Sequence, residues 1–113
     1  MGKCVEIEKD NKIYTLEFDR ASIVEAENKG LDMTQFGTKP MSDFYLLVAA
    51  SLYKHHSGMT STEAKAFADF LLDEGYGMSD ITETLVEMFT EAFHLEGKKK
   101  FVAMTKPTIM AVK

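Results

Sequence analysis

The sequence has very little cysteine: Cys4 is the single one among 113 residues. One cysteine excludes an internal disulfide framework and fits a reducing compartment. Cys4 has no CxxC partner and begins an expected strand, so we interpret it as a small packing residue rather than a nucleophile. The opening residues MGKCVEIEKD also lack the apolar segment of a signal peptide, and we therefore expect a cytoplasmic protein.

Catalytic and nucleotide-binding motifs are lacking as well. The sequence contains no GxGxxG, GxxxxGKS/T or GxSxG pattern. Residues 73–84 have the length of a calcium loop, but Gly75 and Gly77 stand where ligands belong, and Thr84 replaces the final glutamate. No spacing assembles a base, a nucleophile and an oxyanion donor. The sequence therefore predicts neither an enzyme nor a cofactor-binding protein.

Histidine is scarce, with three residues in the chain. His55 and His56 are adjacent, so on a helix their side chains point about 100° apart and cannot both face one metal ion. His94 has no cysteine nearby. We expect no metal site and interpret the histidines as surface or helix-end residues, where the helix dipole favours them.

Basic residues are unevenly distributed. Residues 98–113 hold five lysines and no acid, which leaves eight basic residues against 18 acidic ones in residues 1–97, a net charge of −10. Because phosphate neutralisation supplies most nucleic-acid affinity, an acidic body is a poor ligand for DNA or RNA. The tail lysines come without arginine or patterned aromatics, so we expect no nucleic-acid partner.

The least polar segment, residues 41–56, carries no charge between Asp43 and Lys54. A helix apolar on nearly all sides is a buried one, so we expect the rest of the chain to wrap around it. At ~1.5 Å per residue it spans only about 24 Å between charged flanks, which argues against a membrane span. One helical stripe provides its expected core positions: Phe44, Leu47, Val48, Leu52 and His55.

The remaining pattern predicts an α+β fold. Residues 4–8 and 13–18 alternate between apolar and polar side chains, which indicates a β-hairpin. Asp19 is the expected N-cap of a helix over residues 20–29, and Thr60 with Glu63 forms a capping box for the next helix. Ser79 or Asp80 is expected to cap a final helix. We predict one mostly helical domain over residues 1–97, a hairpin packed on about four helices, followed by a basic and apolar tail over residues 98–113.

Apolar residues in excess of one small core favour a protein-binding role. Eight methionines in a chain this short suit adaptable contacts with a partner, although they are equally well explained as gap-fillers in the core. A compact monomer does not need the apolar side chains near the end of the chain. The predicted protein-binding residues are Val86, Phe89, Phe93, Phe101, Met104 and Met110.

The order of these segments resembles the tail assembly chaperones of long-tailed phages and prophages. The resemblance covers residues 5–96 and is carried by IYTLEFD, RASIVEAENKG, PMSDFYLLVAASLYKHH, TSTEAKAFADFLLDEG and SDITETLVEMFTEAF. It implies a hairpin-plus-helices fold and a protein that binds the long, apolar, helical tape measure protein during tail tube assembly. It also implies a homo-oligomer that is absent from the finished virion and has no catalytic residues.

A small regulatory or DNA-binding adaptor of phage or bacterial origin is the competing hypothesis, because several short helices can include a helix-turn-helix. Two features count against it. The turn expected over residues 73–79 is longer than the usual 3–4 residues, and the final helix is acidic.

The tail has two interpretations. Members of the family that the chain resembles are often made in two lengths by a ribosomal frameshift. Lys98, Lys99 and Lys100 are encoded by AAA or AAG codons, which can form a run of A on which ribosomes slip. Residues 101–113 are then the zero-frame ending of the short product. Alternatively, the lysines solubilise an apolar tail that docks on the hairpin edge or on a partner.

Overall fold

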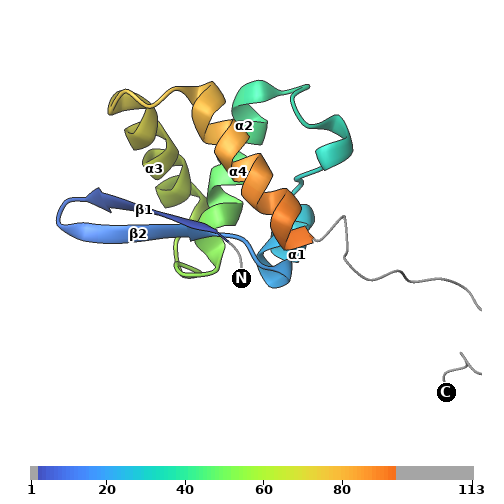
Figure 1. Cartoon of the computed structure of the whole chain (residues 1–113), viewed down its shortest axis with the longest axis horizontal. Helices are drawn as coiled ribbons and strands as arrows, with labels where there is room; N and C mark the ends of the chain where they lie inside the picture. The colour runs from blue at the N-terminus through green and yellow to red at the C-terminus, as the bar shows by residue number, and fades with distance from the viewer. Residues whose placement is uncertain (1–2, 94–113) are drawn as a thin grey trace, which may run out of the picture.

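The computed structural model describes residues 3–93 and has the predicted α+β class, with a hairpin followed by four α-helices (Figure 1). Helix α2 lies at the centre and packs against the other three helices and β2, while α4 crosses in front of it. The elements, in chain order, are β1 (Cys4–Lys9), β2 (Lys12–Glu17), α1 (Arg20–Asn28), a 3-10 turn (Met33–Gln35), α2 (Pro40–Tyr53), α3 (Ser61–Asp73) and α4 (Met78–Phe93).

The hairpin has a two-residue turn formed by Asp10 and Asn11. Both residues have positive φ, 53° and 65°. This is the geometry of the type I′ turn, whose twist matches that of the flanking strands. Lys9 pairs with Lys12 directly beside the turn, so each strand extends one residue further into the connector than the alternation alone predicts.

The core forms where α2 meets the sheet and the other helices. The predicted core residues Phe44, Leu47, Val48 and Leu52 are all buried. His55 is not: α2 ends at Tyr53, and the His55 side chain is exposed.

Apolar residues from β2, α1, α3 and α4 and from the β2–α1 and α1–α2 connections complete the core around α2. They are Leu16, Phe18, Ile23, Ala26, Leu31, Ala64, Phe67, Ala68, Leu71, Leu85, Met88 and Phe89.

The expectation that the chain wraps around α2 is wrong for one side of the helix. Met41 is 44% exposed, and Tyr45, Leu46, Ala49 and Tyr53 are only partly buried. The described elements bury the side of α2 that carries Leu47 and Val48 and cover the opposite apolar side only in part. Within residues 3–93, part of this apolar helix surface therefore reaches solvent.

Local capping signals define two helix starts. Asp19 accepts the backbone N–H of Ser22, and the Ser22 hydroxyl in turn accepts the N–H of Asp19, which makes a capping box at α1. The predicted box of Thr60 and Glu63 is present at α3.

The predicted caps of α4 are wrong. The helix begins at Met78, and the N–H of Ile81 donates to the carbonyl of Gly77. Ser79 and Asp80 therefore lie inside the first turn. Gly75, with φ of 104°, adopts a conformation that favours glycine and lets the chain reverse within the four residues between α3 and α4.

Across residues 3–93, none of the helices combines the length and the apolar composition needed to cross a bilayer.

Candidate functional site

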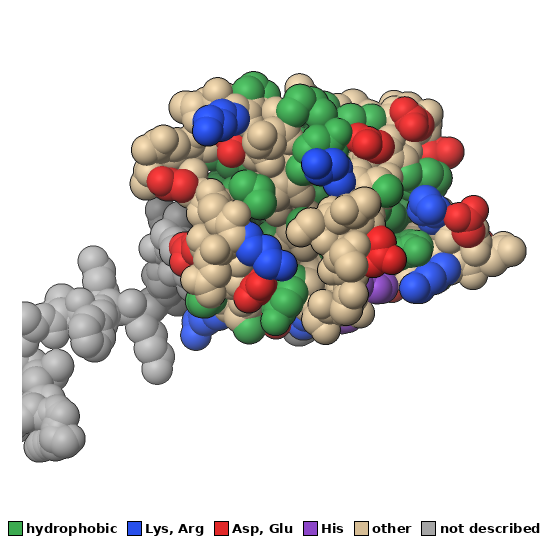
Figure 2. All heavy atoms as spheres, turned by 180° about the vertical axis from the view of Figure 1, so that it is seen from behind, with side chains coloured by type: hydrophobic (Ala, Val, Ile, Leu, Met, Phe, Trp, Pro, Cys, Tyr) green, Lys and Arg blue, Asp and Glu red, His purple; other side chains and the backbone are tan. Residues whose placement is uncertain are grey.

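An apolar opening on the described surface lies between α2 and α3. We call it the α2–α3 groove and define it by Tyr45, Leu46, Ala49, Tyr53, Met59 and Ala64. Its volume is ≈ 450 Å³. Seen from behind, hydrophobic side chains are exposed among lysines and acidic residues on the face away from α4 (Figure 2).

Helical spacing explains why α2 forms one wall of this groove. Tyr45, Ala49 and Tyr53 are separated by four residues, so they form one ridge along the helix surface. Ala49 is small, and it leaves a shallow depression between the two tyrosines. Ala64 of α3 is buried beneath, at the point where the two helices approach each other. The wall is therefore shaped to receive side chains of another helix by ridge-and-groove packing.

The rim of the groove is polar and holds Tyr45 in place. The Tyr45 hydroxyl donates to Asp69 Oδ1 over 2.6 Å, and this hydrogen bond raises the pKa of Tyr45. The Lys65 Nζ lies 5.5 Å from the centre of the Tyr45 ring, within cation–π range. Lys29 also lines the groove and forms an ion pair with Glu25 at 3.4 Å. The groove thus combines an apolar floor with margins that carry both basic and acidic side chains, which suits an apolar segment flanked by polar residues.

The residues predicted to bind a protein are placed elsewhere. Val86 of α4 is partly buried against the core. Phe89 is 4% exposed, and its ring packs edge-on against Phe18 at 5.4 Å between centroids, so it is not available at the surface of the folded chain. The side chain of Phe93 lies outside the described part, as do Phe101, Met104 and Met110.

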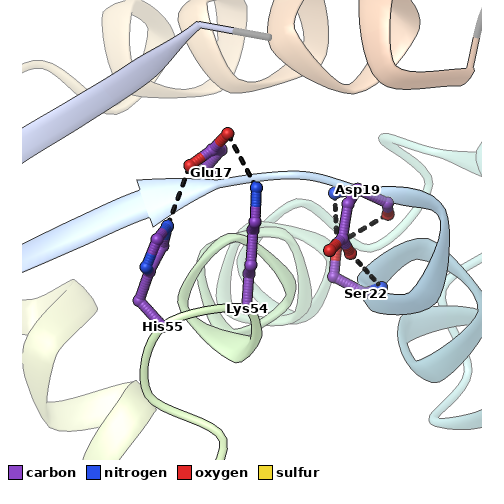
Figure 3. Close-up of polar contacts among 5 residues, drawn as sticks. All are labelled: Glu17, Asp19, Ser22, Lys54 and His55. Carbon is purple, nitrogen blue, oxygen red and sulfur yellow. Dashed lines mark hydrogen bonds and ion pairs between the residues drawn. The ribbon is translucent and has the colours of Figure 1, made fainter. Parts of the chain in front are cut away.

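A polar cluster fastens the end of β2 to the end of α2 (Figure 3). The Glu17 carboxylate accepts hydrogen bonds from Lys54 Nζ at 2.9 Å and meets His55 Nε2 at 2.8 Å. Both contacts lower the pKa of Glu17, and the hydrogen bond with His55 has the larger effect. The hydrogen bond to Glu17 in turn raises the pKa of Lys54. All three groups are satisfied by one another, so we assign the cluster a structural role.

His56 is a second polar anchor for the hairpin. Its Nε2 accepts the backbone N–H of Thr15 over 3.1 Å, which requires a neutral ring with the proton on Nδ1. Burial, followed by the charges of Lys12 and His55, lowers the pKa of His56. The ring also packs against Tyr14 at 5.3 Å between centroids. His55 and His56 thus face different partners and have separate structural contacts.

Within residues 3–93, no three or more His, Cys, Asp or Glu side chains gather in an arrangement that could hold a metal ion.

Sequence reasoning missed the α2–α3 groove because it assigned the whole of α2 to the core. The signal was present in the sequence as the apolar residues on the side of α2 opposite Leu47 and Val48. The apolar pattern does not indicate which side of α2 the other elements cover. The described part of the chain has few elements, and they do not fully cover both sides of the helix.

Comparison with curated proteins finds no match, and comparison with solved structures finds none either. One protein-family profile matches residues 1–102, which is nearly the whole chain and continues past the last residue that the structure describes. The chain therefore belongs to the DUF5055 family, described as a domain of unknown function.

Proposed function

We propose that this protein is a tail assembly chaperone of a long-tailed phage or prophage. In this role it binds the apolar, helical tape measure protein in the host cytoplasm and keeps it soluble until the tail tube encloses it. It is not an enzyme, and it is not retained in the mature virion. The observation that carries the proposal is the α2–α3 groove, an apolar helix surface that the folded chain leaves open beside a second helix.

The physical requirements of such a chaperone fit the described surface. A protein that holds an apolar helix needs an apolar receiving surface of helical shape and a charged exterior that keeps the complex in solution. The ridge of Tyr45, Ala49 and Tyr53 meets the first requirement through ridge-and-groove packing. The net charge of −5 meets the second. The hairpin-plus-helices fold is also the one that the resemblance implies.

The competing DNA-binding role has less support. One argument against it no longer stands: the connection between α3 and α4 comprises four residues, Glu74 to Gly77, and is as short as in a helix-turn-helix. The charge argument remains. Helix α4 has no lysine or arginine, and Asp80, Glu83, Glu87 and Glu91 are all exposed. Such a helix repels the phosphate backbone of a groove that it would have to enter.

Co-expression with the tape measure protein tests the proposal. The client is the very long helical protein encoded near this chain in its genome of origin, and the readout is its soluble yield. We expect the wild-type chain to raise the soluble yield of the client severalfold. The Leu46→Gln variant should give no more soluble client than expression of the client alone, because an amide in the groove removes apolar contact.

Val24→Gln is the matched control. Val24 is apolar and 54% exposed on α1, outside the groove, so this variant is expected to behave as wild type. Thermal melts of both variants identify any loss of folding. An unchanged client yield with folded Leu46→Gln would refute the groove as the binding surface. Tight, salt-sensitive retardation of DNA in a gel would favour the adaptor instead.

A further inference from the structure

A second opening lies where α3 covers the turn end of the hairpin (Figure 1). We call it the hairpin–α3 pocket and define it by Lys9, Lys12, Tyr14, His56, Glu63 and Phe67. Its volume of ≈ 490 Å³ is in the range of small-molecule sites. Apart from Met59, none of the residues that line it belongs to the α2–α3 groove, so the two openings are separate surfaces.

Three aromatic rings form a continuous wall of this pocket. The Tyr14 ring lies 4.9 Å from the Phe67 ring and 5.3 Å from the His56 ring, measured between centroids. Phe67 is 2% exposed, so the core holds this wall in place from behind. Aromatic rings attract a further planar ring in offset or edge-on arrangements. The wall therefore suits an aromatic ligand.

Two lysines supply positive charge beside the rings. The Lys12 Nζ lies 5.0 Å from the centre of the Tyr14 ring, and within residues 3–93 Lys12 forms no ion pair with a carboxylate. Lys9 pairs with Asp10 at 3.2 Å, but the Asp10 side chain is 87% exposed, and solvent weakens such a pair. Both ammonium groups are therefore available to an anionic partner.

The other polar groups of the pocket are compatible with an anion. His56 accepts the Thr15 N–H at Nε2, so its neutral ring carries a proton on Nδ1. In the described part of the chain this Nδ1 has no partner, and no buried side-chain nitrogen is left unsatisfied, so Nδ1 reaches solvent as a free donor. The Glu63 carboxylate is bound to the N–H of Thr60 in the capping box. Two ammonium groups outweigh its single negative charge.

We propose that the hairpin–α3 pocket binds a small aromatic anion, a planar ring that bears a phosphate or a carboxylate. The ring stacks against Tyr14 and His56, and the anionic group meets the ammonium groups of Lys9 and Lys12. Hydrogen bonds between ammonium groups and such oxygens are charge-assisted and stronger than neutral ones. Recognition requires both the ring and the charge. The inference does not depend on client binding, which takes place at the α2–α3 groove.

NMR titration of the full chain with phenyl phosphate tests this site. We expect the signals of Lys12, Thr15 and His56 to shift and saturate. Phenol and inorganic phosphate each carry only one half of the recognised chemistry, so their dissociation constants should be at least about tenfold higher, a difference of about 1.4 kcal/mol. Benzoate distinguishes the two anionic groups, and tighter binding of benzoate than of phenyl phosphate would support the site with a carboxylate as its ligand.

Substitution of the lysines provides the matched comparison. Lys12→Gln removes one charged partner and should weaken binding of phenyl phosphate about tenfold, and Lys9→Gln should also weaken it. Lys65→Gln is the control, because Lys65 lies 5.5 Å from the centre of the Tyr45 ring in the same manner but lines the α2–α3 groove. Thermal melts show that the variants are folded.

Three results would overturn the proposal. The first is the absence of saturable shifts at the pocket with both phenyl phosphate and benzoate. The second is binding of inorganic phosphate as tightly as phenyl phosphate, because the rings would then contribute nothing. The third is equal affinity of the wild-type chain, Lys9→Gln and Lys12→Gln. The soluble yield of the client should be the same with Lys12→Gln as with wild type, so a failure of this site is distinct from a failure of the proposed chaperone function.

Discussion

Leu47 is fully buried in the middle of α2, at 0% exposure, whereas its neighbour Leu46 is only partly buried and lines the α2–α3 groove. The two residues have the same side chain and lie on the same helix, but their surroundings differ. Leu47→Ala leaves a cavity that close-packed neighbours fill only in part, so we expect it to lower the free energy of unfolding by about 2–5 kcal/mol. Urea denaturation measures the loss.

Leu46→Ala is the control for this prediction. It removes the same atoms from a position that solvent already reaches, so its cost should be clearly smaller than that of Leu47→Ala. Equal losses for the two variants would show that α2 is covered on both sides, for example by a second copy. A loss below about 0.5 kcal/mol for Leu47→Ala would place the core elsewhere.

His56 makes stability depend on pH near neutrality. The pKa of His56 is lowered in the folded chain, whereas the unfolded chain takes up the proton near the ordinary value of about 6.5. Below that value the unfolded state binds more protons, so the free energy of unfolding decreases as the pH falls from 7 toward 5. Protonation also removes the acceptor of the Thr15 N–H and adds a charge near Lys12 and His55.

His56→Gln separates the titration from the hydrogen bond. The amide oxygen of glutamine can accept the Thr15 N–H but does not titrate, so the variant should lose less stability than wild type between pH 7 and pH 5. Urea denaturation across this range provides the comparison. Glu17 affects the pH dependence of stability only at lower pH. Its pKa is lowered in the folded chain, so the carboxylate stays ionised until the pH falls below the ordinary pKa range of a glutamate. The same slope in both proteins would exclude His56 as the titrating group.

At the scale of single elements, the hairpin depends on its two-residue turn. Asn11 has φ of 65°, which asparagine and glycine adopt readily and β-branched residues do not. We expect Asn11→Gly to be neutral or slightly stabilising and Asn11→Val to cost about 1–3 kcal/mol. Thermal melts of the two variants measure the difference.

Lys12→Val is a suitable control, since Lys12 is exposed but lies in the strand, where a β-branched residue fits. If Asn11→Val costs no more than this control, then the turn does not have the left-handed geometry seen here.

At the scale of the whole molecule, the α2–α3 groove predicts self-association. A free apolar helix surface is hidden when two copies pack their grooves together, and a client then competes with the second copy. We expect light scattering at micromolar concentration to give a mass above the 12.7 kDa of one chain. Leu46→Gln should shift the protein toward monomer, whereas Val86→Ser should have less effect, because Val86 lies on α4, outside the groove.

A monomer at all concentrations would count against this surface as the oligomer interface. The longer, frameshifted product remains a separate prediction, and it concerns residues outside the described part. Mass spectrometry of the protein expressed from its native gene, with and without recoded lysine codons, tests it.

Elements whose signals are local could be predicted from the amino-acid sequence. Alternation set the two strands, Asp19 and the pair of Thr60 and Glu63 set two helix starts, and the stripe from Phe44 to Leu52 set the core side of α2. Periodicity and capping involve residues within one or two turns of each other, so they can be recognised without knowledge of the fold.

Which apolar surfaces remain accessible depends on how distant segments pack together. Helix α2 is apolar on both sides, so its pattern does not indicate which side the hairpin and other helices cover. Phe89 belongs to the core because Phe18, 71 residues earlier, lies against it, and the Nε2 of His56 meets Thr15 from the distant hairpin. These outcomes depend on contacts between distant segments. The candidate site arises for the same reason: the described elements bury one side of α2 and cover its opposite side only in part.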